Sequence, residues 1–341
     1  MLGEGKYFLG VDVGSVSTNI VLLRSDNTVE ETLYLRTQGR PMQTIQEGIK
    51  LLRSKMRNSA EIIGVGTTGS ARQLAATLLG ADVVKNEITA HAVAASRVNP
   101  DVQTILEIGG QDSKIIILRD GVVSDFAMNT VCAAGTGSFL DQQAARLGIP
   151  IEDFGPLALQ AKHPVQIAGR CSVFAESDMI HKQQLGHSLS DILAGLCQAM
   201  VRNYLNNVGK NKDIRGPIFF QGGVAANPGI RKAFEEELGQ PVIVPEYHGV
   251  MGALGAAYLA QEKVEVQGEI RTKFRGLQLA ETQFQAKSFE CSGCANHCEV
   301  VEIIQDGINL ARWGDRCGKW SHMICANSGG ITRKNEEPQG A

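Results

Sequence analysis

The sequence has 341 residues and a formal net charge of −3, with 43% hydrophobic and 20% charged residues. These values are ordinary for a globular protein, and they show no basic surplus that would indicate a nucleic-acid partner. No apolar run approaches the roughly 20 residues of a membrane-spanning helix, and the first residues lack a signal-peptide pattern. We therefore expect a cytoplasmic protein of two or more domains, with neither membrane nor nucleic acid as a partner.

The first structural signal is a repeated strand–turn–strand pattern. The segment LGVDVGSVSTNIVLL around Asp12 aligns with LEIGGQDSKIIIL around Glu107, so that Gly14 falls on Gly109. In both copies an apolar run ends in an acid, crosses a glycine turn and continues as a second apolar run. This pattern is typical of a β-hairpin and predicts two similar halves, each opened by one hairpin.

Strands and helices alternate after each hairpin. Further strands are expected at 28–36, 104–108, 114–118 and 122–128, and an amphipathic helix at 42–56. This order predicts an α/β fold of two lobes around a cleft, each with a mixed sheet flanked by helices. The expected divisions are lobe I at 1–103, completed by a small-residue helix at 249–261, lobe II at 104–248, a connector at 262–287, a Cys-rich module at 288–325 and a disordered tail at 326–341.

The two glycine turns, DVGSVST and GGQDSK, predict a phosphate site, because they expose backbone N–H groups to an anion. Asp12, at a strand end beside such a turn, would suit Mg²⁺ held through water. Gln111 or Asp112 could orient an attacking water. The predicted nucleotide-binding residues are Gly14, Ser15, Ser17, Thr18, Gly109, Gly110, Ser113, Lys114, Gly222, Gly223 and Asn227.

The glycine pair Gly222–Gly223 lies at the end of an apolar run, directly before a helix that begins near Asn227. Without side chains these two residues would admit a flat ring such as adenine. The two hairpin turns and the glycine pair match neither G-x-x-x-x-G-K-[ST] nor G-x-G-x-x-G, which argues against P-loop and Rossmann sites at these turns. The alternative is that each turn only connects the two strands of its hairpin and binds no ligand.

Two cysteines stand directly before helical patterns: Cys132 in NTVCAAGTGSF and Cys171 in GRCSVFAESD. A helix N-terminus favours a thiolate and an anionic cluster. Since an iron–sulfur cluster usually takes four thiolates and this pair supplies two, we predict a homodimer that shares one [4Fe–4S] cluster across a two-fold axis. The alternative is a pair of buried, inert thiols. Cys197 lies on an apolar helical stripe and is expected in the core.

The other five cysteines crowd the last fifth of the chain. Cys291, Cys294 and Cys298 are close in sequence, and Cys317 follows a hairpin pattern centred on Asp306–Gly307. These four thiols could form one site for structural Zn²⁺ or for a second iron–sulfur cluster. His297 is expected to be a surface residue, and Cys325 is left over.

A family resemblance follows from these motifs. The order of DVGSVST, GVGTTGSAR, EIGGQDSK, QGGVAANPG and GVMGALGAA resembles the actin, Hsp70 and sugar-kinase ATPase superfamily, with ribonuclease H-like lobes. With CAAGTGSF and CSVFAESD added, residues 6 to 262 resemble the ATP-dependent activators of 2-hydroxyacyl-CoA dehydratases and the benzoyl-CoA reductase ATPase subunits. Many activators stop near Gln261, and the tail resembles a cysteine segment beside activator-like units in larger family members.

The resemblance implies a function. ATP or ADP with Mg²⁺ would occupy the cleft, and Cys132 and Cys171 would match the family's cluster ligands in a homodimer. Nucleotide would change the angle between the two cluster-bearing helices and drive one electron from a ferredoxin or flavodoxin onto an acceptor metalloenzyme. That acceptor would be a 2-hydroxyacyl-CoA dehydratase, a double-cubane cluster protein or another low-potential acceptor.

Two other functions remain open from the residues alone. A sugar or other small-molecule kinase would keep the ATP site but would need a substrate pocket with a base, which no motif supplies. A non-redox, actin-like ATPase with a structural zinc tail would contain zinc and no iron. Metal and sulfide analysis of anaerobically prepared protein separates these functions from the redox one.

Overall fold

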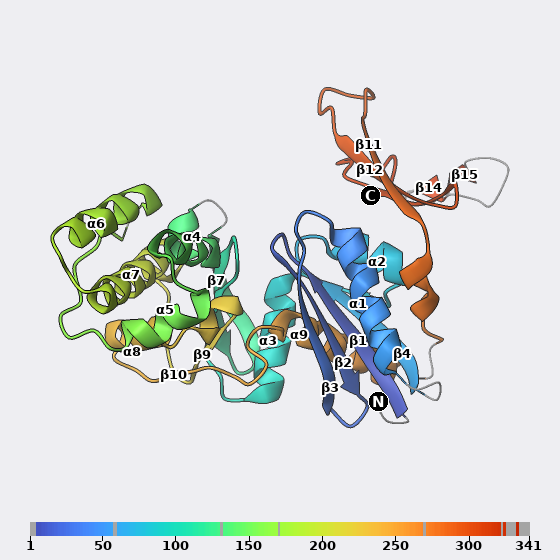
Figure 1. Cartoon of the computed structure of the whole chain (residues 1–341). Helices are drawn as coiled ribbons and strands as arrows, with labels where there is room; N and C mark the ends of the chain where they lie inside the picture. Colours follow the sequence, from blue (N-terminus) through green and yellow to red (C-terminus); the bar gives the residue numbers. More distant parts are fainter. Residues whose placement is uncertain are drawn as a thin grey trace, which may run out of the picture.

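The computed structural model describes residues 5–56, 60–129, 132–169, 171–268, 271–321, 323–324 and 332–333. Two α/β lobes lie side by side in Figure 1, with lobe II to the left, lobe I to the right, and a small C-terminal sheet above lobe I. Cys325 and most of the tail that we predict to be disordered lie outside the described residues.

Lobe I is built on a five-stranded sheet in the order β3-β2-β1-β4-β5. The first hairpin pairs β1 with β2 in antiparallel fashion, and β1 pairs with β4 in parallel, which is the mixed sheet that the sequence predicts. The strands are β1 (Gly5–Val13), β2 (Ser17–Arg24), β3 (Val29–Arg36), β4 (Ala60–Thr68) and β5 (Val83–Val84). The predicted helix at 42–56 is α1 (Pro41–Lys55), which covers one face together with α2 (Arg72–Leu79).

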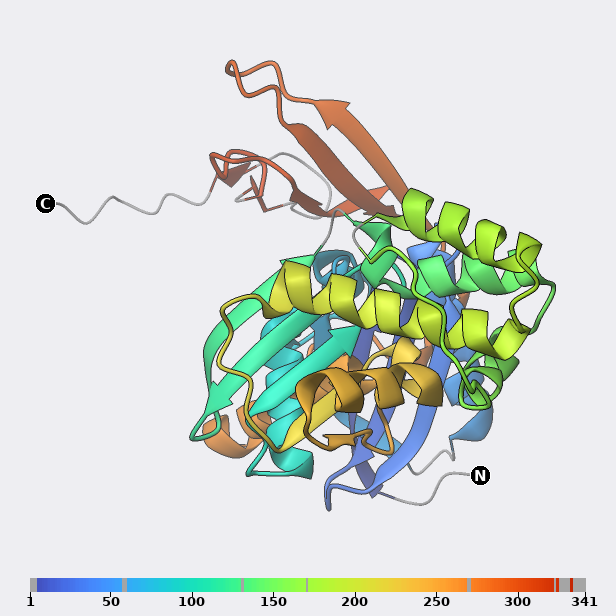
Figure 2. The same ribbon diagram turned by 90° about the vertical axis from the view of Figure 1, so that its left-hand side faces the viewer.

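Lobe II repeats this arrangement. Its sheet has the order β10-β9-β6-β7-β8, the same topology as lobe I when both are numbered from their hairpins. The strands are β6 (Thr104–Ile108), β7 (Ser113–Arg119), β8 (Val122–Asn129), β9 (Ile218–Gln221) and β10 (Val242–Ile243). The outer face carries α4 (Gly137–Leu147), α5 (Ile151–Ala158), α6 (Ser172–Gln184), α7 (Leu189–Tyr204) and α8 (Pro228–Leu238). Figure 2 shows these helices in front of the sheet.

Two helices, α3 (Glu87–Val98) and α9 (Met251–Gln267), lie between the sheets of the two lobes (Figure 1). Their apolar residues share one core with side chains from both sheets, among them Phe8 of β1 and Phe219 of β9. Small residues let α9 approach closely, because a Cβ at Gly10 would lie 1.9 Å from the Ala253 carbonyl oxygen. The sequence predicts a small-residue helix at 249–261 that completes lobe I; α9 covers most of this range and packs between the two sheets.

The C-terminal segment is attached to lobe I. Helix α9 runs on to Gln267, into the predicted connector, and the chain then turns through the short helix η4 (Leu277–Glu281). The Gln46 side chain of α1 donates hydrogen bonds of 3.0 Å and 2.7 Å to the carbonyls of Leu279 and Thr282. Both Leu279 and Ile303 are buried in the lobe I core.

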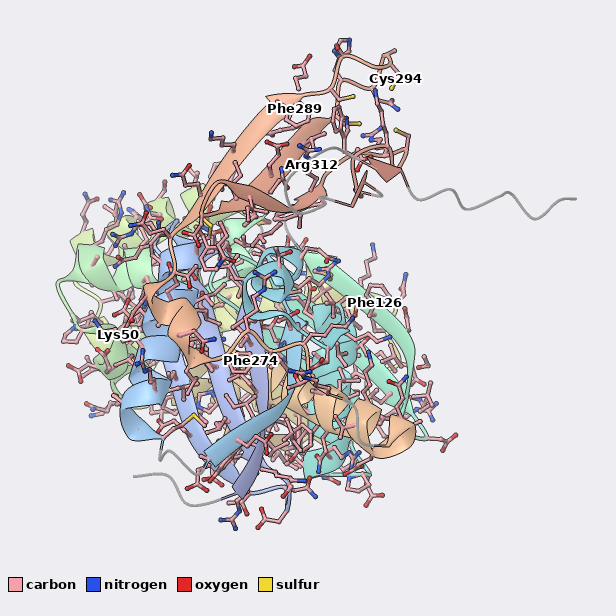
Figure 3. All side chains as sticks on the ribbon, turned by 90° about the vertical axis from the view of Figure 1, so that its right-hand side faces the viewer. Lys50, Phe126, Phe274, Phe289, Cys294 and Arg312 are labelled. Carbon is pink, nitrogen blue, oxygen red and sulfur yellow. The ribbon has the colours of Figure 1, made fainter. Side chains whose placement is uncertain are left out.

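A three-stranded antiparallel sheet follows, formed by β11 (Phe284–Glu290), β12 (Glu299–Gln305) and β13 (Ile308–Trp313). Its β12–β13 hairpin turns at Asp306–Gly307 with φ values of 49° and 82°, which confirms the predicted turn. Figure 3 shows this sheet rising from lobe I, with Phe289 and Cys294 near its far end. Within the described ranges, no helix is both long enough and apolar enough to cross a membrane.

Candidate functional site

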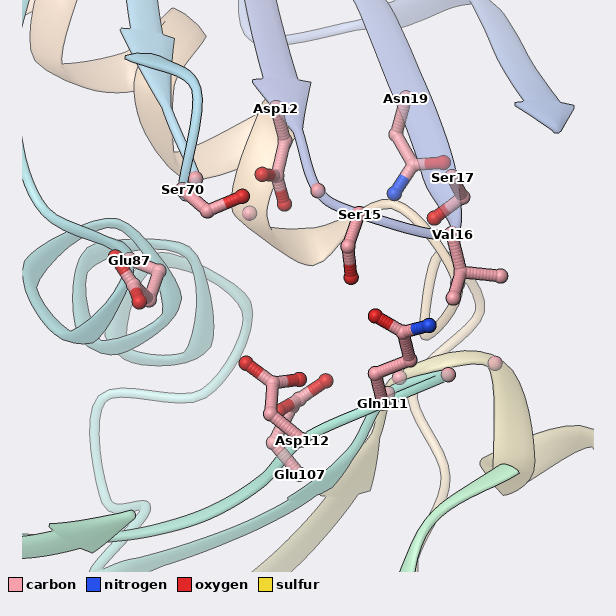
Figure 4. A pocket seen from close by; sticks show the side chains of 18 of the residues that line it. Asp12, Ser15, Val16, Ser17, Asn19, Ser70, Glu87, Glu107, Gln111 and Asp112 are labelled. Carbon is pink, nitrogen blue, oxygen red and sulfur yellow. The ribbon is translucent and has the colours of Figure 1, made fainter. Parts of the chain in front are cut away.

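A cavity of about 270 Å³ separates the two lobes where the hairpins turn. The turn of each hairpin has the same backbone geometry: Gly14 N–H donates to the Ser17 carbonyl at 2.9 Å, and Gly109 N–H donates to the Asp112 carbonyl at 3.0 Å. Figure 4 shows the two turns facing each other across the cavity. The repeat thus brings both predicted phosphate nests to one space.

A second cavity, of about 330 Å³, continues from the first and shares the wall formed by Val16, Tyr34 and Gly223. Its further walls are more apolar, with Leu140 and Val224 among the lining residues. The pairing of a polar and an apolar cavity suits a nucleotide, whose base and sugar would take the apolar part and whose phosphates would reach into the polar part.

Most predicted nucleotide-site residues line these cavities. In the polar cavity are Asp12, Gly14, Ser15, Ser17, Gly109, Gly110, Gln111, Asp112, Lys114, Gly222 and Gly223. Asn227 lines the second cavity and caps α8, where its side-chain oxygen accepts from Gly229 N–H at 2.9 Å.

Thr18 and Ser113 are not brought to the cavity. Both are fully buried within their strands, and the Thr18 hydroxyl lies 3.0 Å from the Thr37 hydroxyl. Side chains alternate between the two faces of a strand. For this reason Ser17 lines the cavity while its neighbour Thr18 points into the lobe.

The polar cavity holds an excess of carboxylates. Lys114 Nζ lies 2.7 Å from Asp112 Oδ2 and 3.0 Å from Glu107 Oε2, and although burial opposes its charge, these two carboxylates raise the pKa of Lys114. Burial raises the pKa of Glu107 to about 7 and that of Asp12 to about 6, both against the effect of Lys114. A divalent cation carried with the nucleotide would offset this negative charge.

The Asp12 carboxylate is also kept accessible by two glycines. A Cβ at Gly69 would lie 2.3 Å from Asp12 Oδ1, and a Cβ at Gly252 would lie 2.1 Å from Asp12 Oδ2. Any larger residue at either position would fill the space around the carboxylate. The residues present therefore fit a Mg²⁺ ion held through water.

Among the side chains of this cavity that sequence reasoning missed are Ser70 after β4, and Glu87 and His91 on α3. Glu87 and His91 are one helical turn apart, so both face the same side of α3. His91 is 6% exposed, and burial lowers its pKa to about 3. The spacing in NEITAH was the available signal, but it shows only that two polar side chains share a helix face.

The two cluster-ligand candidates are free thiols of intermediate exposure. Cys171 caps α6 as predicted, whereas Cys132 caps the short helix η1 (Ala133–Gly135), which separates it from α4. Asn129 holds the Cys132 backbone, accepting from its N–H at 3.0 Å and donating to its carbonyl at 2.9 Å. Since α6 contacts η1, the two cysteine-bearing turns lie on one side of lobe II.

The start of α4 is hydrogen-bonded to the hairpin turn at Gly109–Gly110 of lobe II. We call this turn, and its counterpart at Gly14 in lobe I, the phosphate turns, because the sequence predicts that they bind phosphate. Gly137 N–H donates to the Gly109 carbonyl at 2.8 Å, and Ser138 N–H donates to the Gly110 carbonyl at 2.8 Å. The Ser138 hydroxyl donates to that second carbonyl as well, at 2.6 Å. Only η1 and Thr136 lie between these bonds and Cys132 in the chain.

The remaining cysteines have separate environments. Cys197 is 2% exposed on α7, which confirms its assignment to the core. Cys291 is buried, and Trp320 Nε1–H donates to its sulfur at 3.2 Å. His297 is exposed as predicted and pairs with Glu290 at 2.8 Å. Across the described ranges, no three His, Cys, Asp or Glu side chains are grouped as ligands of one metal ion, so the C-terminal metal site stays a prediction.

Comparison with known proteins matches the two lobes. The chain is 35% identical over 265 residues to the (R)-2-hydroxyglutaryl-CoA dehydratase activating ATPase of Acidaminococcus fermentans, covering 75% of this chain and 98% of that protein. It is 30% identical over 262 residues to one of the subunits of benzoyl-CoA reductase from Thauera aromatica, covering 73% of this chain and 90% of that protein.

A solved structure agrees. The activator of the 2-hydroxyisocaproyl-CoA dehydratase from Clostridium difficile, with bound ADPNP, has a TM-score of 0.70 and 29% identity, over 77% of this chain and 98% of that chain. This confirms the expected actin-like fold of two lobes around a nucleotide cavity. The BadF/BadG/BcrA/BcrD ATPase family model matches residues 9–260, most of the chain before the C-terminal sheet. The chain belongs to the BadF/BadG/BcrA/BcrD ATPase family.

Proposed function

We propose that this protein is an ATP-dependent, one-electron reductase that works as a homodimer and delivers low-potential electrons to a partner metalloenzyme. The observation that carries the proposal is the hydrogen-bonded link from the phosphate turn at Gly109–Gly110 to Gly137 and Ser138, beside Cys132. The names of the relatives, which are activators of dehydratases and a component of a reductase, support it.

Nucleotide would bridge the two lobes. The backbone N–H groups of both turns would face the phosphates, and Asp12 would hold Mg²⁺ through water. Gln111 reaches toward Ser15 and Val16 in Figure 4, where it would meet the phosphate chain. Asp112 keeps Lys114 charged and in place by their 2.7 Å ion pair. Binding of one anion by both turns would draw the lobes together, which is a hinge closure.

Cys132 and Cys171 would hold one [4Fe–4S] cluster together with the same pair of a second copy. When bound, the cluster would supply one-electron oxidation and reduction. The surface around Cys171 suits a second copy, because Val173 and Phe174, which follow it closely on α6, are 66% and 65% exposed. An apolar pair of this kind beside a ligand is expected at a contact between two copies.

The partner would be a metalloenzyme that needs electrons at low potential, such as a 2-hydroxyacyl-CoA dehydratase or a double-cubane cluster protein. A ferredoxin or flavodoxin in the cytoplasm would reload the protein. The C-terminal cysteines Cys291, Cys294, Cys298 and Cys317 would bind Zn²⁺ or a second iron–sulfur cluster at the far end of the appended sheet.

The test is iron, zinc and acid-labile sulfide analysis of anaerobically purified protein, together with ATP-driven reduction of a redox acceptor. Cys132→Ala and Cys171→Ala should each remove about four iron atoms per dimer and abolish reduction, while nucleotide binding is retained. Cys197 is a buried thiol of the same lobe, so Cys197→Ala is the matched control, and this variant should contain as much iron as the wild type. Cys291→Ala should remove a separate metal.

Two results would contradict the proposal. Zinc without iron in anaerobic protein would select a non-redox ATPase with a structural zinc tail. Phosphorylation of a small alcohol or sugar by iron-free protein would select a kinase.

A further inference from the structure

The cavity contains a carboxylate that the proposed nucleotide site leaves without a role. Glu87 begins α3 and lines the polar cavity, but it does not line the apolar cavity in which the nucleoside would sit. Figure 4 shows it at one end of the cavity with Ser70 and Asp12, while Gln111 lies at the other end beside Val16. A triphosphate that enters from the apolar side would therefore place its terminal phosphate toward Glu87.

The other titratable groups of this end are already engaged. Glu107 and Asp112 both pair with Lys114, at 3.0 Å and 2.7 Å. Asp12 stands at the phosphate turn of lobe I, where a cation would take its charge. His91 is buried as a neutral imidazole, so it is a poor acceptor for a proton at neutral pH.

Glu87, by contrast, has one ion-pair partner, and its carboxylate oxygens can still accept hydrogen bonds. Its ion pair is with Arg72 Nη1 at 3.6 Å, and Arg72 Nη1 also donates to the Gly69 carbonyl at 3.0 Å. Among the described residues, no N–H or O–H group donates a hydrogen bond to the Glu87 carboxylate. The arginine thus fixes the carboxylate beside the Gly69–Ser70 turn and leaves its oxygens able to accept from water.

We propose that Glu87 is the residue that accepts a proton from the attacking water during ATP hydrolysis. The water oxygen forms a bond to the γ-phosphorus, the bond from that phosphorus to the β–γ bridging oxygen breaks, and its electron pair leaves with ADP. The proton lost by the water passes to the Glu87 carboxylate and from there to solvent. The inference rests on the ATPase function proposed above and assigns its proton acceptor.

The test compares steady-state ATP hydrolysis and the Kd for Mg·ADPNP in the full-length, anaerobically prepared protein. Glu87→Gln keeps the size of the side chain and removes its basicity. The turnover number kcat should fall by about 100-fold or more, with KM and the Kd for Mg·ADPNP changed by less than about threefold. Glu237→Gln, an exposed position on α8, is the matched control and should match the wild type.

Chemical rescue separates proton transfer from a structural role. Formate added to the Glu87→Ala variant should restore hydrolysis several-fold, because a small carboxylate can occupy the vacated space; it should not change the Glu237→Gln protein. If the wild type does not hydrolyse ATP, the proposed function fails and the inference fails with it. If the wild type hydrolyses ATP, the inference alone is overturned by a near-normal kcat in Glu87→Gln, by an equal loss of affinity and turnover, or by a Glu87→Ala variant that formate does not reactivate.

Discussion

Replacing Asp12 with asparagine should stabilise the nucleotide-free protein at neutral pH while abolishing Mg²⁺-dependent nucleotide binding. Burial raises the pKa of this carboxyl from 3.8 to about 6, so the fold disfavours its charged form. A shift of about two pKa units corresponds to about 3 kcal/mol. This figure is an upper limit, because Asp12 lines a cavity that water enters.

The gain should depend on pH in a defined direction. Below pH 3.8 the carboxyl is protonated in both the folded and the unfolded chain, and the charge costs the fold nothing. Between pH 3.8 and about 6 the unfolded chain loses this proton while the folded wild type keeps it, so the free energy of unfolding of the wild type falls relative to the Asp12→Asn variant. Above about pH 6 the difference is constant. The advantage of the variant should therefore be at most about 3 kcal/mol at pH 7.5 and at most about 1 kcal/mol at pH 4.5.

Urea unfolding with EDTA and without nucleotide, at both pH values, measures this difference. Asp101→Asn, an exposed carboxylate, is the control and should show no comparable gain. Calorimetric titration with Mg·ADPNP should give no detectable binding to Asp12→Asn. A variant that is no more stable than the wild type at pH 7.5, or whose advantage is the same at pH 4.5, would refute the reasoning.

Three further substitutions test other parts of the structure. Gly252→Ala places a Cβ 2.1 Å from Asp12 Oδ2, and it should weaken Mg·ADPNP binding by at least about tenfold in a calorimetric titration; wild-type affinity would contradict this. Ser138→Ala removes the 2.6 Å hydrogen bond to the Gly110 carbonyl. It should lower the number of electrons delivered per ATP, while nucleotide affinity stays within about threefold of the wild type. An unchanged number of electrons per ATP would show that this bond does not couple the phosphate turn to Cys132. Ile303→Ala should lower the free energy of unfolding by about 2–4 kcal/mol in urea unfolding, because Ile303 is buried in the lobe I core. Ile308 is 48% exposed on the same sheet, and Ile308→Ala should change the free energy of unfolding by less than about 1 kcal/mol. Equal effects would argue against docking of the appended sheet on lobe I.

The strands of both lobes could be predicted from the sequence because their signals are local. An acid, a glycine turn and two apolar runs occur twice, and each copy forms the same antiparallel pair: Asp12 opposite Asn19 in one, Glu107 opposite Lys114 in the other. For the same reason the predicted residues within the turns line the cavity. Thr18 and Ser113 do not line it, because alternation along a strand turns every second side chain away from the cavity.

Other parts depend on contacts far apart in the sequence. Glu87 reaches the cavity because α3 packs on α9, where a Cβ at Gly255 would lie 1.9 Å from the Ala90 carbonyl oxygen. The order of polar and apolar residues in α3 does not show which helix α3 packs against. In the same way, the segment after Gln267 reads as a polar connector, yet Leu279 is 2% exposed and completes the lobe I core.

The two lobes repeat one fold, but only one copy of the repeat is extended toward the cysteines. In lobe II the chain runs through β8 to Cys132 and then through η1 to α4, whose first residues bond back to the phosphate turn at Gly110. Residues 1–103 of lobe I contain no cysteine, and this lobe instead carries the appended sheet, held by Gln46. A nucleotide that closes the cavity would therefore change the position of the appended sheet relative to Cys132, because each is fixed to a different lobe. The same closure would bring Glu87 of lobe I to the terminal phosphate, so that hydrolysis and movement of the cysteines depend on one event.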